Sequence, residues 1–140
     1  MTGFKLDGLF FDSRPVIDAM DRKERASLSR IGAFIRTAAR SLMRRRKRYS
    51  RPGEPPSVHE GSLKNKLFFS YDPRTKSVVV GPAKYKQGDI PRLLEEGGDE
   101  SVVHKGVMER IHIEPRPFMQ PALKQEMPNI PDAFGTGLHA

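Results

Sequence analysis

The sequence predicts an α+β fold in which a long N-terminal helix packs on a small antiparallel β-sheet, followed by a short C-terminal helix and an extended tail. Three observations favour this class. Residues 16–46 contain no proline and only one glycine, two β-branched and aromatic segments flank a turn at 72–74, and prolines recur after residue 114. A length of 140 residues is typical of one domain, so we treat residues 1–140 as a single unit.

The N-terminal residues 1–12 include the apolar segment FKLDGLFF, which indicates an ordered arm or a strand. Asp12 or Ser13 is suited to cap a helix, and Pro15 is suited to its first turn. We therefore predict a long helix over 14–46, either continuous or broken near residues 21–24.

The second half of this helix has an apolar face, because apolar residues recur at steps of three and four. The face comprises Leu28, Ile31, Ile35, Ala38, Ala39 and Leu42. Gly32 lies beside it and is small enough to allow another backbone to approach closely. A separate basic row on the exposed side comprises Arg36, Arg40, Arg44 and Lys47.

Prolines and a glycine make residues 50–62 a stiff loop. Residues 63–83 are predicted to form a β-hairpin, with its turn at Asp72–Arg74 and with Val78–Val80 buried on both faces. Residues 90–127 supply the remaining sheet and short helices, one of them beginning at Pro121. Because Pro128 and Pro131 follow, we expect residues 128–140 to form an extended tail.

The composition favours a thin core that relies on partners for part of its burial. Hydrophobic residues make up 36% of the chain, compared with ~45–50% in typical domains, and the net charge is +8. This charge favours polyanions or acidic protein surfaces as partners. The absence of cysteine excludes disulfides and cysteine-ligated metals, and no run of about 18 apolar residues predicts a membrane span.

Catalytic patterns are weak. The four histidines are scattered, and Ser57 and His59 are near each other without a third partner. Glu95 and Glu96 are adjacent, so their side chains diverge by about 100° on a helix. With no phosphate-binding glycine loop, we expect a protein that is not an enzyme and that has no cofactor or metal.

A basic run is the strongest charge feature of the sequence. Five consecutive charges point all round a helix, so they are either a solvated helix end or a site that contacts DNA phosphates or an acidic partner without reading sequence. The candidate contact residues are Arg40, Arg44, Arg45, Arg46, Lys47 and Arg48.

Apolar residues near the C-terminus are candidates for subunit docking, although those nearest the prolines are equally suited to fill the protein's own core. Pro117 and Pro121 stiffen this segment, which lowers the entropy cost of fixing it. The docking candidates are Phe118, Met119, Leu123, Ile130, Phe134 and Leu138.

Several segments occur in a familiar order: GEPPSVHEGSLKNKLFF, VVVGPAKY, IPRLLEEGG and RPFMQPAL. In this order the chain resembles the tail-completion and neck (head–tail joining) proteins of tailed bacteriophages over about residues 28–123. Glu60 and Gly98 stand where that family usually has Thr, and residues 99–113 are longer than its pattern. The matching residues are Pro55, Pro56, His59, Gly61, Leu63, Gly81, Pro82, Leu94, Glu96, Gly97, Arg116, Pro117, Phe118, Pro121 and Ala122.

The resemblance implies a structural virion protein that assembles in the host bacterial cytoplasm. Such proteins form homo-oligomeric rings, here expected to be hexameric or else dodecameric, at the head–tail junction or the top of the tail. Their neighbours are connector, neck and tail proteins, and the basic residues would then line a DNA channel or grip an acidic neighbour. The alternative is a sequence-independent DNA-binding accessory protein.

Overall fold

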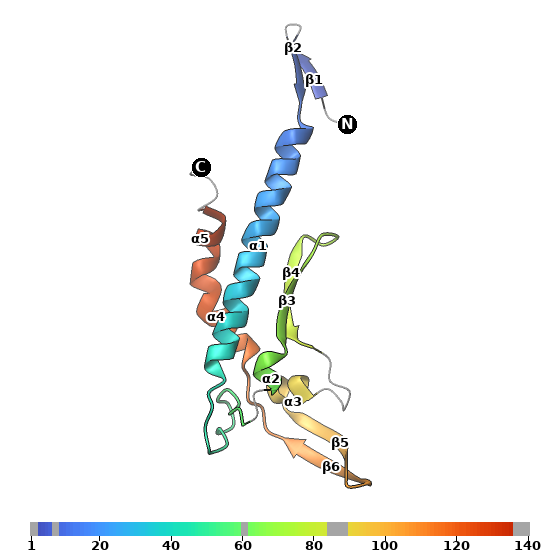
Figure 1. Ribbon diagram of the computed structural model, residues 1–140, viewed down its shortest axis with the longest axis vertical. Coiled ribbons are helices and arrows are strands. Elements are labelled where there is room, and N and C mark those ends of the chain that lie inside the picture. Colours follow the sequence, from blue (N-terminus) through green and yellow to red (C-terminus); the bar gives the residue numbers. More distant parts are fainter. Residues whose placement is uncertain (1–2, 7–8, 60–61, 84–89, 136–140) are drawn as a thin grey trace.

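The computed structural model describes residues 3–6, 9–59, 62–83 and 90–135, and its shape is elongated (Figure 1). Helix α1 (Arg14–Leu42) is the central element. The hairpin of β1 (Gly3–Leu6) and β2 (Leu9–Asp12) lies beyond the N-terminal end of α1. The predicted α+β class is confirmed. Of the two alternatives for the N-terminal segment, an ordered arm or a strand, the structure shows strands at residues 3–6 and 9–12.

Helix α1 begins where the sequence predicts and continues through residues 21–24 without a break. A proline occupies its first turn, but the Ser13 side chain makes no capping hydrogen bond. The helix ends at Leu42 rather than at residue 46. Met43 is extended and fully buried, and the chain then pairs with the proline-rich loop, since Val58 N donates to Arg44 O at 3.1 Å.

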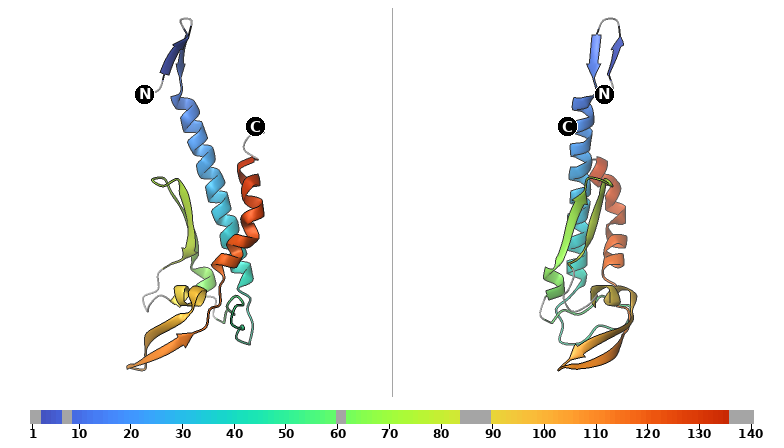
Figure 2. Two further views of the ribbon diagram at one scale, coloured as in Figure 1. Left: turned by 180° about the vertical axis from the view of Figure 1, so that it is seen from behind. Right: turned by 90° about the vertical axis from the view of Figure 1, so that its right-hand side faces the viewer.

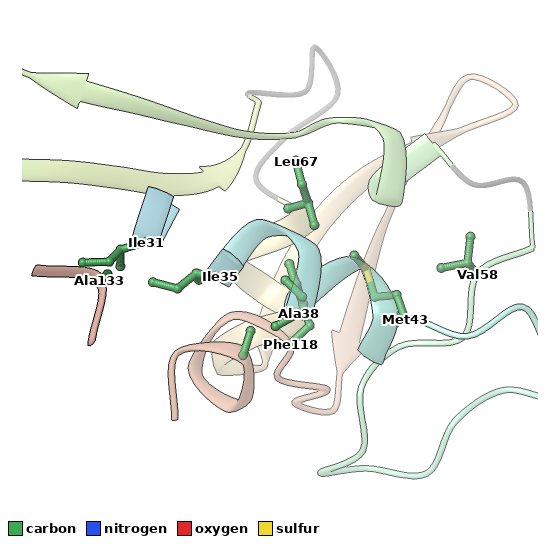
Figure 3. Packing of buried hydrophobic residues seen from close by; sticks show 10 residues of the cluster. Ile31, Ile35, Ala38, Met43, Val58, Leu67, Phe118 and Ala133 are labelled. Atoms are coloured by element: carbon green, nitrogen blue, oxygen red, sulfur yellow. The ribbon is translucent and has the colours of Figure 1, made fainter. Parts of the chain in front are cut away.

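The core lies around the C-terminal half of α1 (Figure 3). The predicted apolar face is confirmed, because four of its residues are buried and Leu28 and Leu42 are packed against them. Among the described residues the buried hydrophobic set is small, as the composition indicates. It comprises Ile31, Ile35, Ala38, Ala39, Met43, Val58, Leu67, Phe118, Ala122 and Ala133.

Two groups of elements flank α1 on different sides (Figures 1 and 2). One is the antiparallel hairpin of β3 (Leu67–Asp72) and β4 (Ser77–Pro82). The other is α4 (Met119–Glu126), followed by the single 3₁₀ turn η1 (Met127–Asn129) and by α5 (Ile130–Gly135). Helix α1 contacts both groups, so it is the shared wall of the core.

The predicted close approach of another segment to Gly32 is observed. A Cβ atom at this position would lie 2.6 Å from Val78 Cγ2 and 3.0 Å from Phe69 Cδ2, so the β3–β4 hairpin packs directly on α1. The approaching atoms belong to side chains, whereas the sequence predicts a backbone. Nearby, Arg36 Nε donates to Leu67 O at 2.6 Å, so Arg36 leaves the exposed basic row and fixes the start of β3.

The β-structure consists of three separate two-stranded sheets within the described chain. The third sheet is formed by β5 (Gly98–His104) and β6 (Val107–Ile113), and it projects away from the core beside α3 (Ile90–Glu96) (Figure 1). The observed β3–β4 hairpin is shorter than the hairpin predicted over 63–83, because the first residues of that range belong to the short helix α2 (Ser62–Asn65). The prediction for Val78–Val80 is also wrong, since Val79 is 64% exposed on the outer face of the hairpin.

The prediction of an extended tail over residues 128–140 is wrong for the part that the structure describes. Residues 127–135 are helical, and Ala133 is buried against the core. The two prolines are tolerated because each lies in the first turn of a new helical element, where the missing N–H has no intrahelical partner. The remaining predicted tail residues, including Leu138, lie outside the described chain.

The segment around Phe118 is fixed by backbone contacts from distant residues. Gly53 N donates to Pro115 O at 2.8 Å, and Arg116 Nε donates to Ser50 O at 3.1 Å. Glu95 in α3 accepts hydrogen bonds from the backbone N–H groups that begin α4. These hydrogen bonds therefore hold a junction between the proline-rich loop, α3 and α4.

Candidate interaction surfaces

The protein exposes far more surface than a compact monomer of its size. Its accessible area is 10810 Å² for a mass of 15.8 kDa. A compact monomer of this mass exposes roughly 7,300 Å², so the excess is roughly 3,500 Å². The shape contributes to this excess, because the β1–β2 hairpin, the first half of α1 and the β5–β6 hairpin project from the core (Figures 1 and 2).

An apolar stripe marks the N-terminal part of α1. It consists of Val16, Ile17 and Met20, which are 48%, 46% and 65% exposed. At 100° per residue Ile17 and Met20 fall in the same sector of the helix as the buried Ile31 and Ile35, whereas Val16 lies about 60° to one side of Ile31. The core-facing side of α1 thus continues beyond the elements that cover it.

An apolar groove lies at the other end of the same helix face. It has a volume of about 260 Å³ and is bounded by α1, β4 and α4. Ile35 is buried, whereas Leu123 at the edge is 44% exposed. The lining residues are Ile35, Val78, Val80, Met119, Gln120 and Leu123. Sequence reasoning selected Met119 and Leu123 but missed the valines, because it expected them to be fully covered.

A second apolar surface lies on the β3–β4 hairpin, where Phe68 and Val79 are exposed. A shallow depression of about 210 Å³ includes both residues together with Phe69 and Pro82. Sequence reasoning missed this patch. The sequence feature that could have revealed it is the pair of adjacent phenylalanines at 68 and 69. Neighbouring residues in a strand point to opposite faces, so only one of the two can face α1 and the other is left on the outer face.

The predicted docking residues divide into three groups. Phe118 is fully buried, so it closes the protein's own core and is not available for docking. Met119 and Ile130 are half-buried against that core. Leu123 and Phe134 are exposed and remain docking candidates.

The basic run forms a loop instead of a helix end. Residues 44–48 are all exposed and follow the last residue of α1, while Arg40 remains in the last helical turn and is half-buried. Arg46 Nη1 of this loop lies 4.0 Å from Glu54 Oε2, and an ion pair this long between exposed side chains is weak. The loop therefore presents a concentrated positive charge at one end of the core.

The neighbouring loop holds the histidine that the sequence places near Ser57. The His59 ring meets Tyr49 edge-on, with the ring centroids 5.1 Å apart. The Ser57 hydroxyl is buried and has no protein hydrogen-bond partner. Among the described residues, no three His, Asp or Glu side chains are placed to hold a metal ion.

Ionic contacts fix the two hairpins that carry exposed residues. Lys76 Nζ in the β3–β4 turn lies 2.9 Å from Asp21 and 3.7 Å from Glu24 of α1, and these carboxylates raise the Lys76 pKa. On β5–β6, His112 Nδ1 lies 2.8 Å from Asp99 Oδ1. This hydrogen bond raises the pKa of His112 and lowers that of Asp99.

No protein-family model, curated protein or solved structure matches the chain significantly. In the part of the chain that the structure describes, no helix combines the length and apolar character needed to cross a bilayer.

Proposed function

We propose that the protein is a structural virion component of a tailed bacteriophage, a neck or tail-completion subunit that forms a ring at the head–tail junction or the top of the tail. The observation that carries the proposal is the excess of exposed surface, roughly 3,500 Å² above that of a compact monomer. A standard interface buries about 800 Å² on each partner. An excess of this size supports a subunit that buries surface against two neighbours, as a ring requires.

Two further features support this assignment. The apolar stripe on α1 and the apolar groove beside α4 are separate, as expected for a subunit with a neighbour on each side. The order of motifs through residues 116–123 resembles the phage neck and tail-completion pattern. Arg116 and Phe118 of the last motif hold the junction of the fold, which gives these motif residues a structural role.

The test is loss of the protein from the phage that encodes it. Interrupting its gene should leave DNA-filled heads and tails that remain unjoined or are unstable, and wild-type virions should contain the protein in six or twelve copies by quantitative mass spectrometry. Joined, infectious particles at normal yield without the protein would refute the proposal.

The exposed basic loop favours one second candidate, a sequence-independent DNA-binding accessory protein. Salt titration with duplex DNA discriminates between the two. Tight binding by the monomer, with a log–log slope that corresponds to several phosphates, favours the accessory protein. Neutralising Arg44, Arg45, Lys47 and Arg48 to Gln should then reduce that slope, whereas Arg92→Gln in α3 serves as a distant control.

A further inference from the structure

A pocket lies between the basic loop (residues 44–48) and the proline-rich loop that follows it. Its volume is about 270 Å³, and it is lined by Leu42, Arg44 and Arg46 from one segment and by residues 54–57 from the other. Arg45, which stands between the two arginines in the chain, does not line the pocket. One wall is therefore cationic, and the other is built largely from two prolines.

Backbone contacts hold the two walls together. Val58 N donates to Arg44 O at 3.1 Å, and Arg45 forms a parallel β-bridge with Val58. The proline-rich loop is also fixed to the junction before α4, because Gly53 N donates to Pro115 O at 2.8 Å. The walls are thus held in place by the fold itself, and a site built in advance lowers the entropy cost of binding.

The charges of the pocket suit an anion. Arg46 Nη1 lies 4.0 Å from Glu54 Oε2, and both side chains are about half exposed, so this internal ion pair is weak and an external anion can replace it. Two arginines face one carboxylate, so the pocket keeps a net positive charge. The position of Glu54 shows where a negatively charged oxygen meets Arg46.

The pocket also contains a hydroxyl group. Ser57 is one of the lining residues, and its buried Oγ atom has no hydrogen-bond partner among the described residues. Buried hydroxyls are normally paired, and a serine hydroxyl can donate to an anionic oxygen. Ser57 therefore adds a third polar group to the two arginines.

We propose that this pocket binds one phosphate group of a nucleic-acid strand, held by Arg44 and Arg46. Guanidinium groups match the oxygens of a phosphate in bidentate pairs. Pockets that enclose a whole small molecule have volumes of roughly 300–1,000 Å³, so one of about 270 Å³ suits a single group of a longer chain. The net charge of +8 attracts polyanions to the protein. The inference goes beyond the proposed virion role and does not depend on it.

The experiment measures binding of a short fluorescein-labelled oligothymidylate to the full-length protein by fluorescence anisotropy in phosphate-free buffer. Arg46→Gln and Arg45→Gln each remove one positive charge from the same exposed loop, but only Arg46 lines the pocket. Glu54→Gln removes the competing carboxylate and keeps an amide oxygen for the Arg51 N–H, which donates to Glu54 Oε2 at 3.4 Å. Thermal melting confirms that each variant is folded.

We expect Arg46→Gln to weaken binding at least fivefold and Arg45→Gln to weaken it by no more than twofold. Glu54→Gln should strengthen binding at least twofold, because the bound phosphate no longer competes with a carboxylate. Equal losses for Arg45→Gln and Arg46→Gln would show diffuse attraction to the whole loop and would overturn the proposal. Tighter binding of a hexaglutamate peptide than of the oligothymidylate would also overturn it, in favour of an acidic protein partner.

Competition with inorganic phosphate separates a strand phosphate from a free phosphate ion. We expect inorganic phosphate to displace the oligothymidylate only at much higher phosphate concentration, because a single ion lacks the contacts of the rest of the strand. Displacement at equal phosphate concentration would assign the pocket to the free ion and would contradict the nucleic-acid assignment. Neither result bears on virion assembly, which is measured separately by particle yield and copy number.

Discussion

The carboxylate of Glu95 caps the helix that begins after Phe118. Its Oε2 atom accepts hydrogen bonds from Phe118 N at 2.9 Å and Met119 N at 3.0 Å, and its Oε1 atom accepts one from Gln120 N at 2.8 Å. A negative charge at this position also suits the positive end of the helix dipole. One side chain of α3 thus satisfies three otherwise unpaired donors of α4.

Replacing Glu95 by Gln should lower the free energy of unfolding by about 1–2 kcal/mol, because an amide has one acceptor oxygen and no charge. Its amide N–H₂ would face backbone donors. Chemical denaturation followed by circular dichroism measures the change.

The matched control is Glu96→Gln on the same helix. Glu96 is exposed and pairs with Arg92 at 3.0 Å one turn away, a type of contact that contributes about 0.3–0.5 kcal/mol. Equal losses of stability in the two variants would contradict the capping role of Glu95.

Gly32→Ala should be destabilising although alanine is the better helix former. The new Cβ would lie 2.6 Å from Val78 Cγ2, so the β3–β4 hairpin must move away from α1. We expect a net loss of about 1–2 kcal/mol, since overpacking costs about 1–3 kcal/mol and the helix propensity gain is up to about 1 kcal/mol.

The double variant Gly32→Ala/Val78→Ala separates the clash from other causes. Removing the Val78 methyl groups should make the alanine at 32 less costly than in the single variant, a coupling that a double-mutant cycle measures. Additive effects within about 0.3 kcal/mol would show that the hairpin does not press on Gly32.

Ile35→Asp should unfold the domain at room temperature. Ile35 is 6% exposed in the centre of the apolar face, and burying an unpaired carboxylate there is far more costly than the small stability of a thin core permits. Phe34→Asp on the neighbouring exposed position is the control and should remain folded. An unchanged melting temperature for Ile35→Asp would show that the core lies elsewhere.

The β5–β6 hairpin should be most stable in mildly acidic solution. The Asp99 hydrogen bond raises the pKa of His112 above its ordinary 6.5, so this contribution is complete below pH 6.5 and is lost as the pH rises through the raised value. The hydrogen bond from His112 lowers the pKa of Asp99 below 3.8, so that contribution is present above pH 3.8 and is lost as the pH falls through the lowered value. The two conditions overlap between about pH 4 and 6.5.

Nuclear magnetic resonance titration of the His112 ring checks this directly. Asp99→Asn should move the His112 pKa down towards 6.5. Glu109→Gln on the same hairpin should leave the His112 titration unchanged, because residue 109 points to the opposite face of the strand from residue 112. A downward shift of equal size in both variants would show that general hairpin charge, not the Asp99 contact, sets the pKa.

The sequence by itself determined the elements with strong local signals. Helix periodicity located the buried face of α1 at Ile31 and Ile35, Pro15 indicated the start of that helix, and the turn residues Asp72–Arg74 placed the β3–β4 hairpin. These signals act between residues a few positions apart, so they can be read along the chain.

The tertiary structure alone decided the contacts between distant residues. It assigned Phe118 to the core instead of to a docking surface, gave Glu95 its place at the start of α4, and made residues 127–135 helical by packing Ala133 against α1. It also left Ile17 and Met20 exposed, although they continue the same apolar face as Ile31. The physical reason is that a residue on an apolar helix face is buried only where another segment packs on it. The spacing of apolar residues along the helix defines the face, but it does not say how far along the helix the packing segments extend.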